Sequence, residues 1–187
     1  GTVDLRKGVD HFISIARTHE KLQASGRPVF FCWVGDGPRH PHSAHHYVDI
    51  DIAKSGQQNI RMLGEDADVE PYFVGADTFL LTSRVDPFPC VIHEAMAARL
   101  PVVVFEESGG ATEAVADNSG IVVPFADYIE TSRTIDHLCD NPGYARQIAE
   151  RGFTRVHQQY RFEDYADRII RLCEGELGTP LFKPRQD

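Results

Sequence analysis

The feature that most constrains the fold is a run of four segments between residues 77 and 105. An apolar stretch at 77–82 is followed by a polar loop with two prolines, a helical pattern at 91–100 and a second apolar stretch at 101–105. Strand, loop, helix and strand in this order build a parallel sheet. In such sheets ligands bind at the carboxyl ends of the strands, where loops lead into helices. The sequence therefore predicts an α/β fold with its functional site at this loop.

Further segments of both kinds lie on either side of this unit. Helices are predicted at 8–24, 44–55, 66–73, 126–140, 143–158 and 162–173, and strands at 29–34, 59–64 and 121–124. The stretch 29–34 is apolar throughout, which is typical of a strand covered on both faces and places Cys32 in the interior. We expect one Rossmann-like domain over residues 1–174, followed by an irregular tail at 175–187. Its parallel sheet should have about six strands, with helices on both faces.

Composition restricts the classes of partner. The 187 residues are 42% hydrophobic and 25% charged, as in soluble globular proteins. The formal net charge of −9 argues against nucleic acid or an anionic membrane as a partner. No apolar run approaches the length of a membrane span, and the dispersed cysteines form no CxxC pair. We predict a cytoplasmic protein with reduced thiols, and peripheral association with the inner membrane face stays open.

Two acidic residues stand out in the central unit. Asp86 in the loop and Glu94 in the helix have seven residues between them. A helix beginning near Val91 directs free backbone N–H groups at the loop, and such helix ends bind phosphate. Carboxylates beside it can accept hydrogen bonds from sugar hydroxyls, each worth roughly 1.5–3 kcal/mol. The spacing leaves equally open that Glu94 only complements the helix dipole and that Asp86 only caps a turn.

Basic residues and glycines supply further candidate contacts. Arg6 and Lys7 precede a glycine and a helix, where cations could meet a diphosphate; an ordinary solvated pair is the simpler interpretation. Several glycines follow apolar runs and allow close backbone approach to a ligand, or only form turns: Gly35, Gly37, Gly109 and Gly110. None belongs to a GxGxxG motif with an acid at the required distance, so a nicotinamide-dinucleotide fold is not supported.

Histidines cluster at residues 40–46 and raise the question of a metal site. His42 and His46 could share one face of a helix as ligands. The chain has no HExxH motif and Pro41 interrupts a local helix, so a surface loop without metal is the favoured interpretation. His93, in the helix of the central unit, should face away from the second acid and is interpreted as structural.

Taken in order, these segments resemble the C-terminal domain of retaining glycosyltransferases of family 4, which have the GT-B architecture. The resemblance extends from Gly1 to about Arg171. Its motifs lie at residues 7–8, 34–38, 59–64, 86–102, 109–113 and 120–124. The most specific is 86–102, because it is similar to the family's motif of two acids separated by seven residues.

The resemblance implies a site for a nucleotide-diphosphate sugar of the UDP or GDP type, without a metal or other cofactor. The residues that it assigns are Asp86 and Glu94 as catalytic residues, and Arg6, Lys7, Gly35, Gly64, Glu65, Phe88, Cys90 and Val91 as donor-binding residues. Among them, Glu94 would bind the ribose, Asp86 the transferred hexose and Lys7 the diphosphate. Catalysis would then consist mainly of positioning and of stabilising the leaving diphosphate.

Four positions depart from the family pattern. Asp86 replaces the usual Glu, prolines at 87 and 89 replace the usual glycines, and Thr2 stands where an Arg often contacts diphosphate. Pro89 has no N–H to donate. A non-catalytic nucleotide-sugar-binding module of the same fold is therefore an alternative. A GT-B sugar-nucleotide epimerase is another, although the spacing of the acids argues against it.

In GT-B enzymes the acceptor binds to an N-terminal domain, and this chain, which opens on Gly1 rather than Met, has no counterpart of it. We expect the chain to be the donor half of an enzyme that transfers a hexose to a glycan or polysaccharide. Alone, it should bind nucleotide weakly and transfer no sugar.

Overall fold

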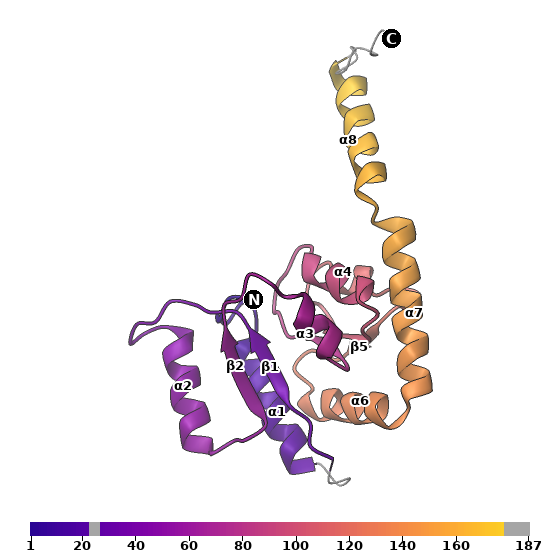
Figure 1. Ribbon diagram of the computed structural model, residues 1–187. Helices are drawn as coiled ribbons and strands as arrows, with labels where there is room; N and C mark the ends of the chain where they lie inside the picture. The colour runs from indigo at the N-terminus through magenta and orange to yellow at the C-terminus, as the bar shows by residue number, and fades with distance from the viewer. Residues whose placement is uncertain (23–26, 178–187) are drawn as a thin grey trace.

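The computed structural model describes residues 1–22 and 27–177, in which helices and strands alternate as predicted (Figure 1). In chain order the elements are α1 (Val9–Leu22), β1 (Phe31–Val34), α2 (Ala44–Ser55), β2 (Ile60–Gly64), α3 (Glu70–Gly75), β3 (Phe79–Leu81), α4 (Cys90–Ala97), β4 (Val102–Phe105), α5 (Ala111–Ala114), β5 (Ile121–Val123), α6 (Tyr128–Asp140), α7 (Pro142–Gln159) and α8 (Phe162–Leu177). Helix α3 begins at Glu70 rather than at residue 66, and α4 ends at Ala97 rather than at residue 100. The predicted end of α1, at residue 24, lies outside the described residues.

Among the described residues, all strand pairs are parallel and the strands form two sheets. One sheet pairs β1 with β2, and the other has the order β3-β4-β5. The described residues thus contain five parallel strands divided between two sheets, fewer than the single sheet of about six that was predicted. At the carboxyl ends of β1 and β3, the N-terminal segment 1–8 is hydrogen-bonded to the residues that follow each of these strands. Val3 N–H donates to the Asp36 carbonyl at 3.0 Å, and Arg84 N–H donates to the Arg6 carbonyl at 2.9 Å.

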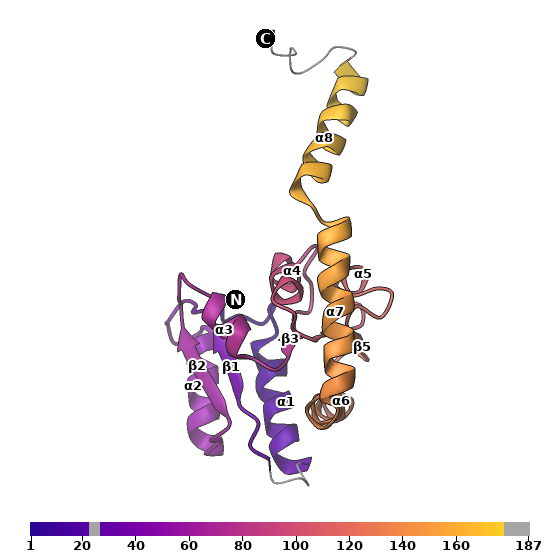
Figure 2. The same cartoon turned by 45° about the vertical axis from the view of Figure 1, so that its right-hand side comes forward.

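The hydrophobic core continues across the gap between the sheets, and around β4 it lies on both faces of the sheet. Strand β4 is buried completely. Its Val103 and Phe105 belong to a cluster with α1, α6 and the buried side of β1, while Val102 and Val104 belong to a second cluster with α4 and α5. The prediction of helices on both faces is confirmed, and Figure 2 shows α1 and α4 on different sides of β3.

Strand β1 is covered on one face only. Phe31 and Trp33 are buried, whereas Phe30 and Cys32 are exposed. The prediction that Cys32 lies in the interior was wrong, because an unbroken apolar run does not reveal whether one face or both are covered.

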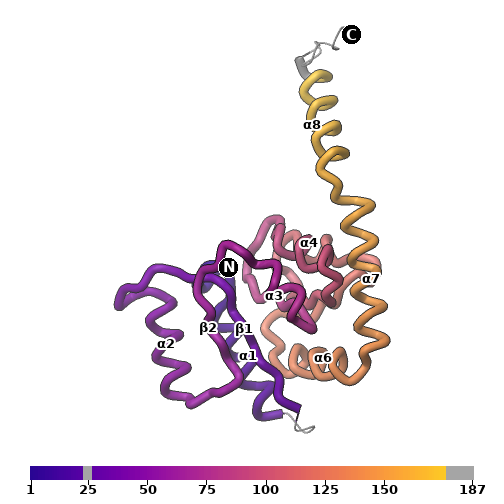
Figure 3. The backbone as a smooth tube through the Cα atoms, in the orientation of Figure 1, coloured from indigo at the N-terminus to yellow at the C-terminus, as the bar shows by residue number. Residues whose placement is uncertain are grey.

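The C-terminal helices α7 and α8 follow one another, and α8 extends away from the body of the domain (Figure 3). Helix α8 continues through Gly175 to Leu177, so the predicted irregular tail does not begin at residue 175. The remainder of that tail, 178–187, lies outside the described residues. Within the described part of the chain, no helix combines the length and the apolar character needed to cross a membrane.

Candidate functional site

Two loops at the carboxyl ends of β3 and β4 are joined by backbone hydrogen bonds. Asp86 N–H donates to the Ser108 carbonyl at 3.0 Å, and Gly110 N–H donates to the Asp86 carbonyl at 3.1 Å. Gly109, between these partners, has φ +94°, and a Cβ atom there would overlap the Asp86 carbonyl oxygen. The absence of a side chain at Gly109 therefore lets the two loops meet.

The N-terminal segment is hydrogen-bonded to the residues between the end of β3 and Asp86. The carbonyl of Lys7 accepts a hydrogen bond from Thr82 Oγ1 at 3.1 Å, and the carbonyl of Arg6 accepts from Arg84 N–H. The Arg84 guanidinium also donates to the Leu5 carbonyl. Three consecutive carbonyls thus hold the segment that carries Lys7 against this loop.

The structure brings the predicted cation and the predicted first acid together. Lys7 Nζ lies 2.5 Å from Asp86 Oδ2. Asp86 is only 7% exposed, whereas the Lys7 side chain retains 24% exposure. A charge-assisted hydrogen bond of this kind holds the ammonium at the mouth of the loop. Arg6, the other predicted cation, is exposed.

A second ion pair beside this one was not predicted. The Arg84 guanidinium donates to both carboxylate oxygens of Asp10, at 2.7 and 2.6 Å. These hydrogen bonds are the main reason why the pKa of Asp10 lies below its usual value, and nearby positive charge adds to the effect. The only signal in the sequence is an acid in the first turn of α1, because the pair joins residues that are distant in the chain.

Helix α4 begins directly after the loop and presents free donors there. Its N-cap is Pro89, which provides no side-chain cap. The backbone N–H groups of Cys90 and Val91 have no acceptor among the residues that the structure describes, as expected for a first helical turn. Cys90 is exposed and Val91 is half-buried, so this end of the helix is not closed off by protein.

Glu94 lies on the exposed side of α4, while Ile92, Ala95 and Met96 face the core. Its carboxylate forms no ion pair within the described part of the chain. The structure thus leaves Glu94 available to a ligand. That Asp86 and Glu94 both accept hydrogen bonds from sugar hydroxyls stays a prediction.

Three aromatic rings pack together beside the loop that contains Asp86. The Phe88 ring, 47% exposed, lies over the His93 ring with the centroids 4.8 Å apart, and Tyr160 packs edge-on against His93 at 4.4 Å. Burial lowers the pKa of His93, and its Nε2 atom has no hydrogen-bond partner in the described structure. These contacts agree with the structural role predicted for His93.

Three of the residues predicted to bind the donor, Gly35, Gly64 and Glu65, lie at the ends of β1 and β2. Gly35 N–H donates to the Gly64 carbonyl at 2.6 Å, and Glu65 follows with an exposed side chain. Gly1 reaches the same place, because its carbonyl accepts from Trp33 Nε1 at 3.0 Å. The N-terminal segment therefore connects this end of the site with the Lys7 and Asp86 pair.

The histidine cluster has a structural part that the sequence did not suggest. His45 is buried, and its two ring nitrogens lie 2.9 Å from an Asp36 oxygen and 3.2 Å from an Asp49 oxygen. His42 and His46 are exposed. His45 therefore connects helix α2 to the turn that follows β1, whereas its neighbours lie on the surface as predicted.

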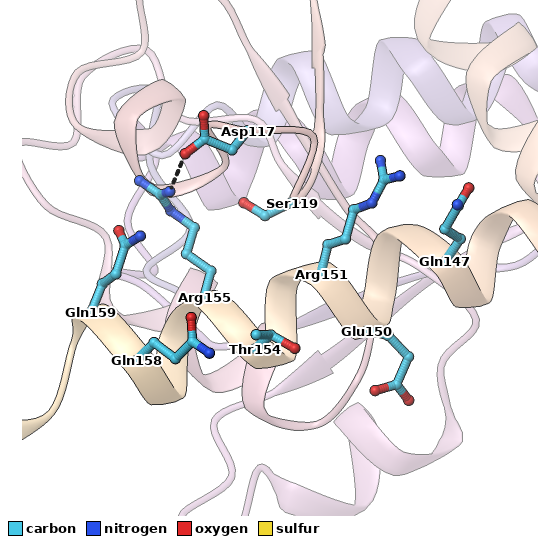
Figure 4. Close-up of a pocket in the computed structure, with 9 residues that line it drawn as sticks. All are labelled: Asp117, Ser119, Gln147, Glu150, Arg151, Thr154, Arg155, Gln158 and Gln159. Atoms are coloured by element: carbon cyan, nitrogen blue, oxygen red, sulfur yellow. Dashed lines mark hydrogen bonds and ion pairs between the residues drawn. The ribbon is translucent and has the colours of Figure 1, made fainter.

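A polar hollow of about 400 Å³ lies elsewhere, along α7 (Figure 4). Its lining consists of Asp117, Ser119, Gln147, Glu150, Arg151, Thr154, Arg155, Gln158 and Gln159, and none of these was predicted as a site residue. In Figure 4, Arg155 pairs with Asp117 across one end of the hollow. We place the candidate site at the strand ends instead, because the charged groups, the free helix donors and the loops meet there.

Comparison with known families decides the class of this protein. The family model described as glycosyl transferases group 1 matches residues 1–155. The chain belongs to this family. The matched region includes the loops around Asp86, α4 and Lys7, and thus the whole candidate site.

Known glycosyl transferases and their structures agree with this assignment. The lipopolysaccharide core biosynthesis glycosyltransferase LpsE of Rhizobium meliloti is 26% identical over 167 residues, which are 88% of this chain and 48% of LpsE. The crystal structure of HepE from Anabaena in complex with UDP matches with a TM-score of 0.81 at 22% identity, covering 94% of this chain and 47% of HepE. The C-terminal domain of LpcC, a glycosyl transferase group 1 family protein of Francisella tularensis, matches with a TM-score of 0.73 at 20% identity, over 87% of this chain and 84% of that domain.

These likenesses establish the fold as that of a GT-B C-terminal domain. The chain spans about half the length of LpsE and of HepE.

Proposed function

We propose that this chain is the donor-binding half of a retaining glycosyltransferase of family 4. The whole protein would transfer a hexose from a UDP or GDP sugar to a glycan or polysaccharide. The observation that carries the proposal is the meeting of Lys7, Asp86 and the open end of α4 at the carboxyl ends of parallel strands, in a chain of this family. The UDP bound in HepE and the biosynthetic role in the name of LpsE support it.

Each group has a role that follows from its chemistry. The Lys7 ammonium and the N–H groups of Cys90 and Val91 would hold the diphosphate, since cations and helix ends both favour negative charge. Asp86 would accept hydrogen bonds from the hexose, and Glu94 from the ribose. When the bond between sugar and diphosphate breaks, negative charge grows on the leaving diphosphate, where these donors already point. We propose no metal for this step.

The first experiment measures binding to the chain itself. Calorimetry with UDP, GDP and their hexose derivatives should show weak binding of one nucleotide class. Lys7→Ala and Glu94→Ala should each weaken it by about tenfold or more, because each removes a charged hydrogen bond. The matched controls are Lys54→Ala and Glu20→Ala, on exposed faces of α2 and α1, which should leave the affinity unchanged. Equal losses in variants and controls, or no binding at all, would contradict the proposal.

The second experiment tests transfer in the full-length protein. Glu94→Ala should abolish transfer of the sugar to a glycan acceptor while the folded protein is still produced. A non-catalytic binding module is the second candidate, and Pro89 favours it, because it removes one N–H donor at the start of α4. A full-length protein that binds the nucleotide sugar but transfers nothing to any glycan acceptor would support this module instead.

All four cysteines are free. This fits a reducing compartment, and we place the full-length protein in the cytoplasm, with or without peripheral attachment to the inner membrane face.

A further inference from the structure

Arg84 makes contacts that concern the segment before α1 rather than its own loop. Its guanidinium binds both oxygens of Asp10, in the first turn of α1, and donates to the Leu5 carbonyl. Its backbone N–H donates to the Arg6 carbonyl at 2.9 Å. One residue therefore contacts the chain at Leu5 and Arg6, before Lys7, and at Asp10, three residues after it.

These contacts determine where the Lys7 ammonium can lie. A lysine side chain is long and flexible, so the position of its charge depends on how firmly its backbone is held. Within the described structure, the backbone of Lys7 itself is held by the Thr82 hydroxyl on its carbonyl and by the Asp4 carboxylate on its N–H, at 2.7 Å. Only Arg84 joins this segment to both the loop of Asp86 and the start of α1.

The geometry of the Arg84 pair suits a positioning function. A guanidinium that meets a carboxylate through two parallel hydrogen bonds has a fixed orientation, which an ammonium cannot reproduce. The pair is only partly exposed, with 35% exposure for the Arg84 side chain and 42% for Asp10. It is therefore screened less than an ion pair in open solvent.

We infer that Arg84 is a positioning residue for donor binding: by clamping Asp10 and the Leu5 and Arg6 carbonyls, it holds Lys7 where the diphosphate is bound. Arg84 itself need not contact the ligand. The inference rests on the proposed function, because it assumes that Lys7 binds the diphosphate.

A double-mutant cycle on the full chain tests the inference. The affinity for the preferred nucleotide diphosphate, UDP or GDP, is measured by NMR titration for wild type, Arg84→Lys, Lys7→Ala and the double variant. Arg84→Lys should weaken binding about tenfold in the wild-type background. In the Lys7→Ala background it should change affinity by less than about twofold, because the group that it positions is already absent. Asp10→Asn should reproduce the effect of Arg84→Lys.

The control is Arg17→Lys, which alters another arginine and aspartate pair of α1, at 3.5 Å from Asp51 and away from the loops. It should leave the affinity unchanged. Melting temperatures are recorded for every variant, and thermal stability alone cannot produce the non-additive affinities expected here.

The outcomes separate the two hypotheses. If Lys7→Ala weakens binding but Arg84→Lys has no effect, or costs the same factor in both backgrounds, the positioning role of Arg84 is refuted and the proposed function stands. If wild type binds neither nucleotide, or if Lys7→Ala leaves the affinity unchanged, the assignment of Lys7 is refuted and the inference about Arg84 with it.

Discussion

The contact between the loops after β3 and β4 can be tested through Gly109. Its φ of +94° is costly for any residue with a side chain, and a Cβ atom would overlap the Asp86 carbonyl oxygen. Gly109→Ala must therefore strain the backbone and separate two loops that are joined by the hydrogen bonds between Asp86 and Ser108 and between Gly110 and Asp86. The substitution changes no charge and removes no side chain, so its effect reports on this contact alone.

The two costs can be added. A non-glycine residue with positive φ costs about 1–2 kcal/mol. Loss or weakening of two backbone hydrogen bonds costs about 1 kcal/mol each. Gly109→Ala should therefore lower the free energy of unfolding by about 3–4 kcal/mol, which corresponds to a fall in Tm of roughly 6–16 °C for a domain of this size.

Gly56 provides the matched control. It follows α2 with φ +66°, and a Cβ atom there would have no neighbour within 4 Å. Gly56→Ala pays the backbone cost without the clash, so we expect a loss of only about 1–2 kcal/mol. Urea unfolding followed by circular dichroism measures both variants. If they lose the same stability, the loops tolerate separation and the close contact at Asp86 does not matter for the fold.

Three further predictions concern other parts of the molecule. Because burial lowers the pKa of His93, its neutral form is favoured in the folded state; this contribution to stability is complete above pH of about 6.5 and is lost as the pH falls through the folded pKa. Tm should therefore fall between pH 7.5 and 5, and less steeply in His93→Leu than in the control His42→Gln; parallel slopes would contradict this. Phe162→Ser on α8, at a position that is 77% exposed, should change the free energy of unfolding by less than about 0.5 kcal/mol in urea unfolding, and a loss above about 2 kcal/mol would show that the ring is packed. Under the proposed function, protein donors rather than a metal hold the diphosphate, so nucleotide binding should be equally strong with and without EDTA in calorimetry; a loss of affinity in EDTA would indicate a required metal.

The order of elements could be predicted because each short apolar run is followed by turn residues and a helical pattern. The start of α4 was predicted to within one residue, since Pro87 and Pro89 exclude a helix before Cys90. By contrast, the apolar run containing Cys32 does not show which face of the strand is exposed. Helix α8 continues beyond Gly175, where an irregular tail was predicted, because a single glycine costs a helix only about 1 kcal/mol.

The contacts within the site could not be predicted from local sequence patterns. Lys7 and Asp86 are 79 positions apart, and Asp10 and Arg84 are 74 apart. Their meeting depends on where the N-terminal segment lies, which no periodicity encodes. The residue pattern and the family resemblance supplied Lys7 and Asp86 as separate candidates, but neither supplied their ion pair or Arg84.

The ion pair also determines how the proposed donor would be recognised. Asp86 is nearly buried, so a diphosphate that draws Lys7 away leaves a carboxylate without its partner, and an unpaired buried charge is costly. Hydroxyls of the hexose can replace the ammonium as donors to Asp86, whereas a nucleotide without sugar cannot. Under the proposed function, the nucleotide sugar should therefore bind more tightly than the nucleotide diphosphate alone in the same calorimetric series. Tighter binding of the bare nucleotide would mean that Lys7 stays with Asp86 and that other groups hold the diphosphate.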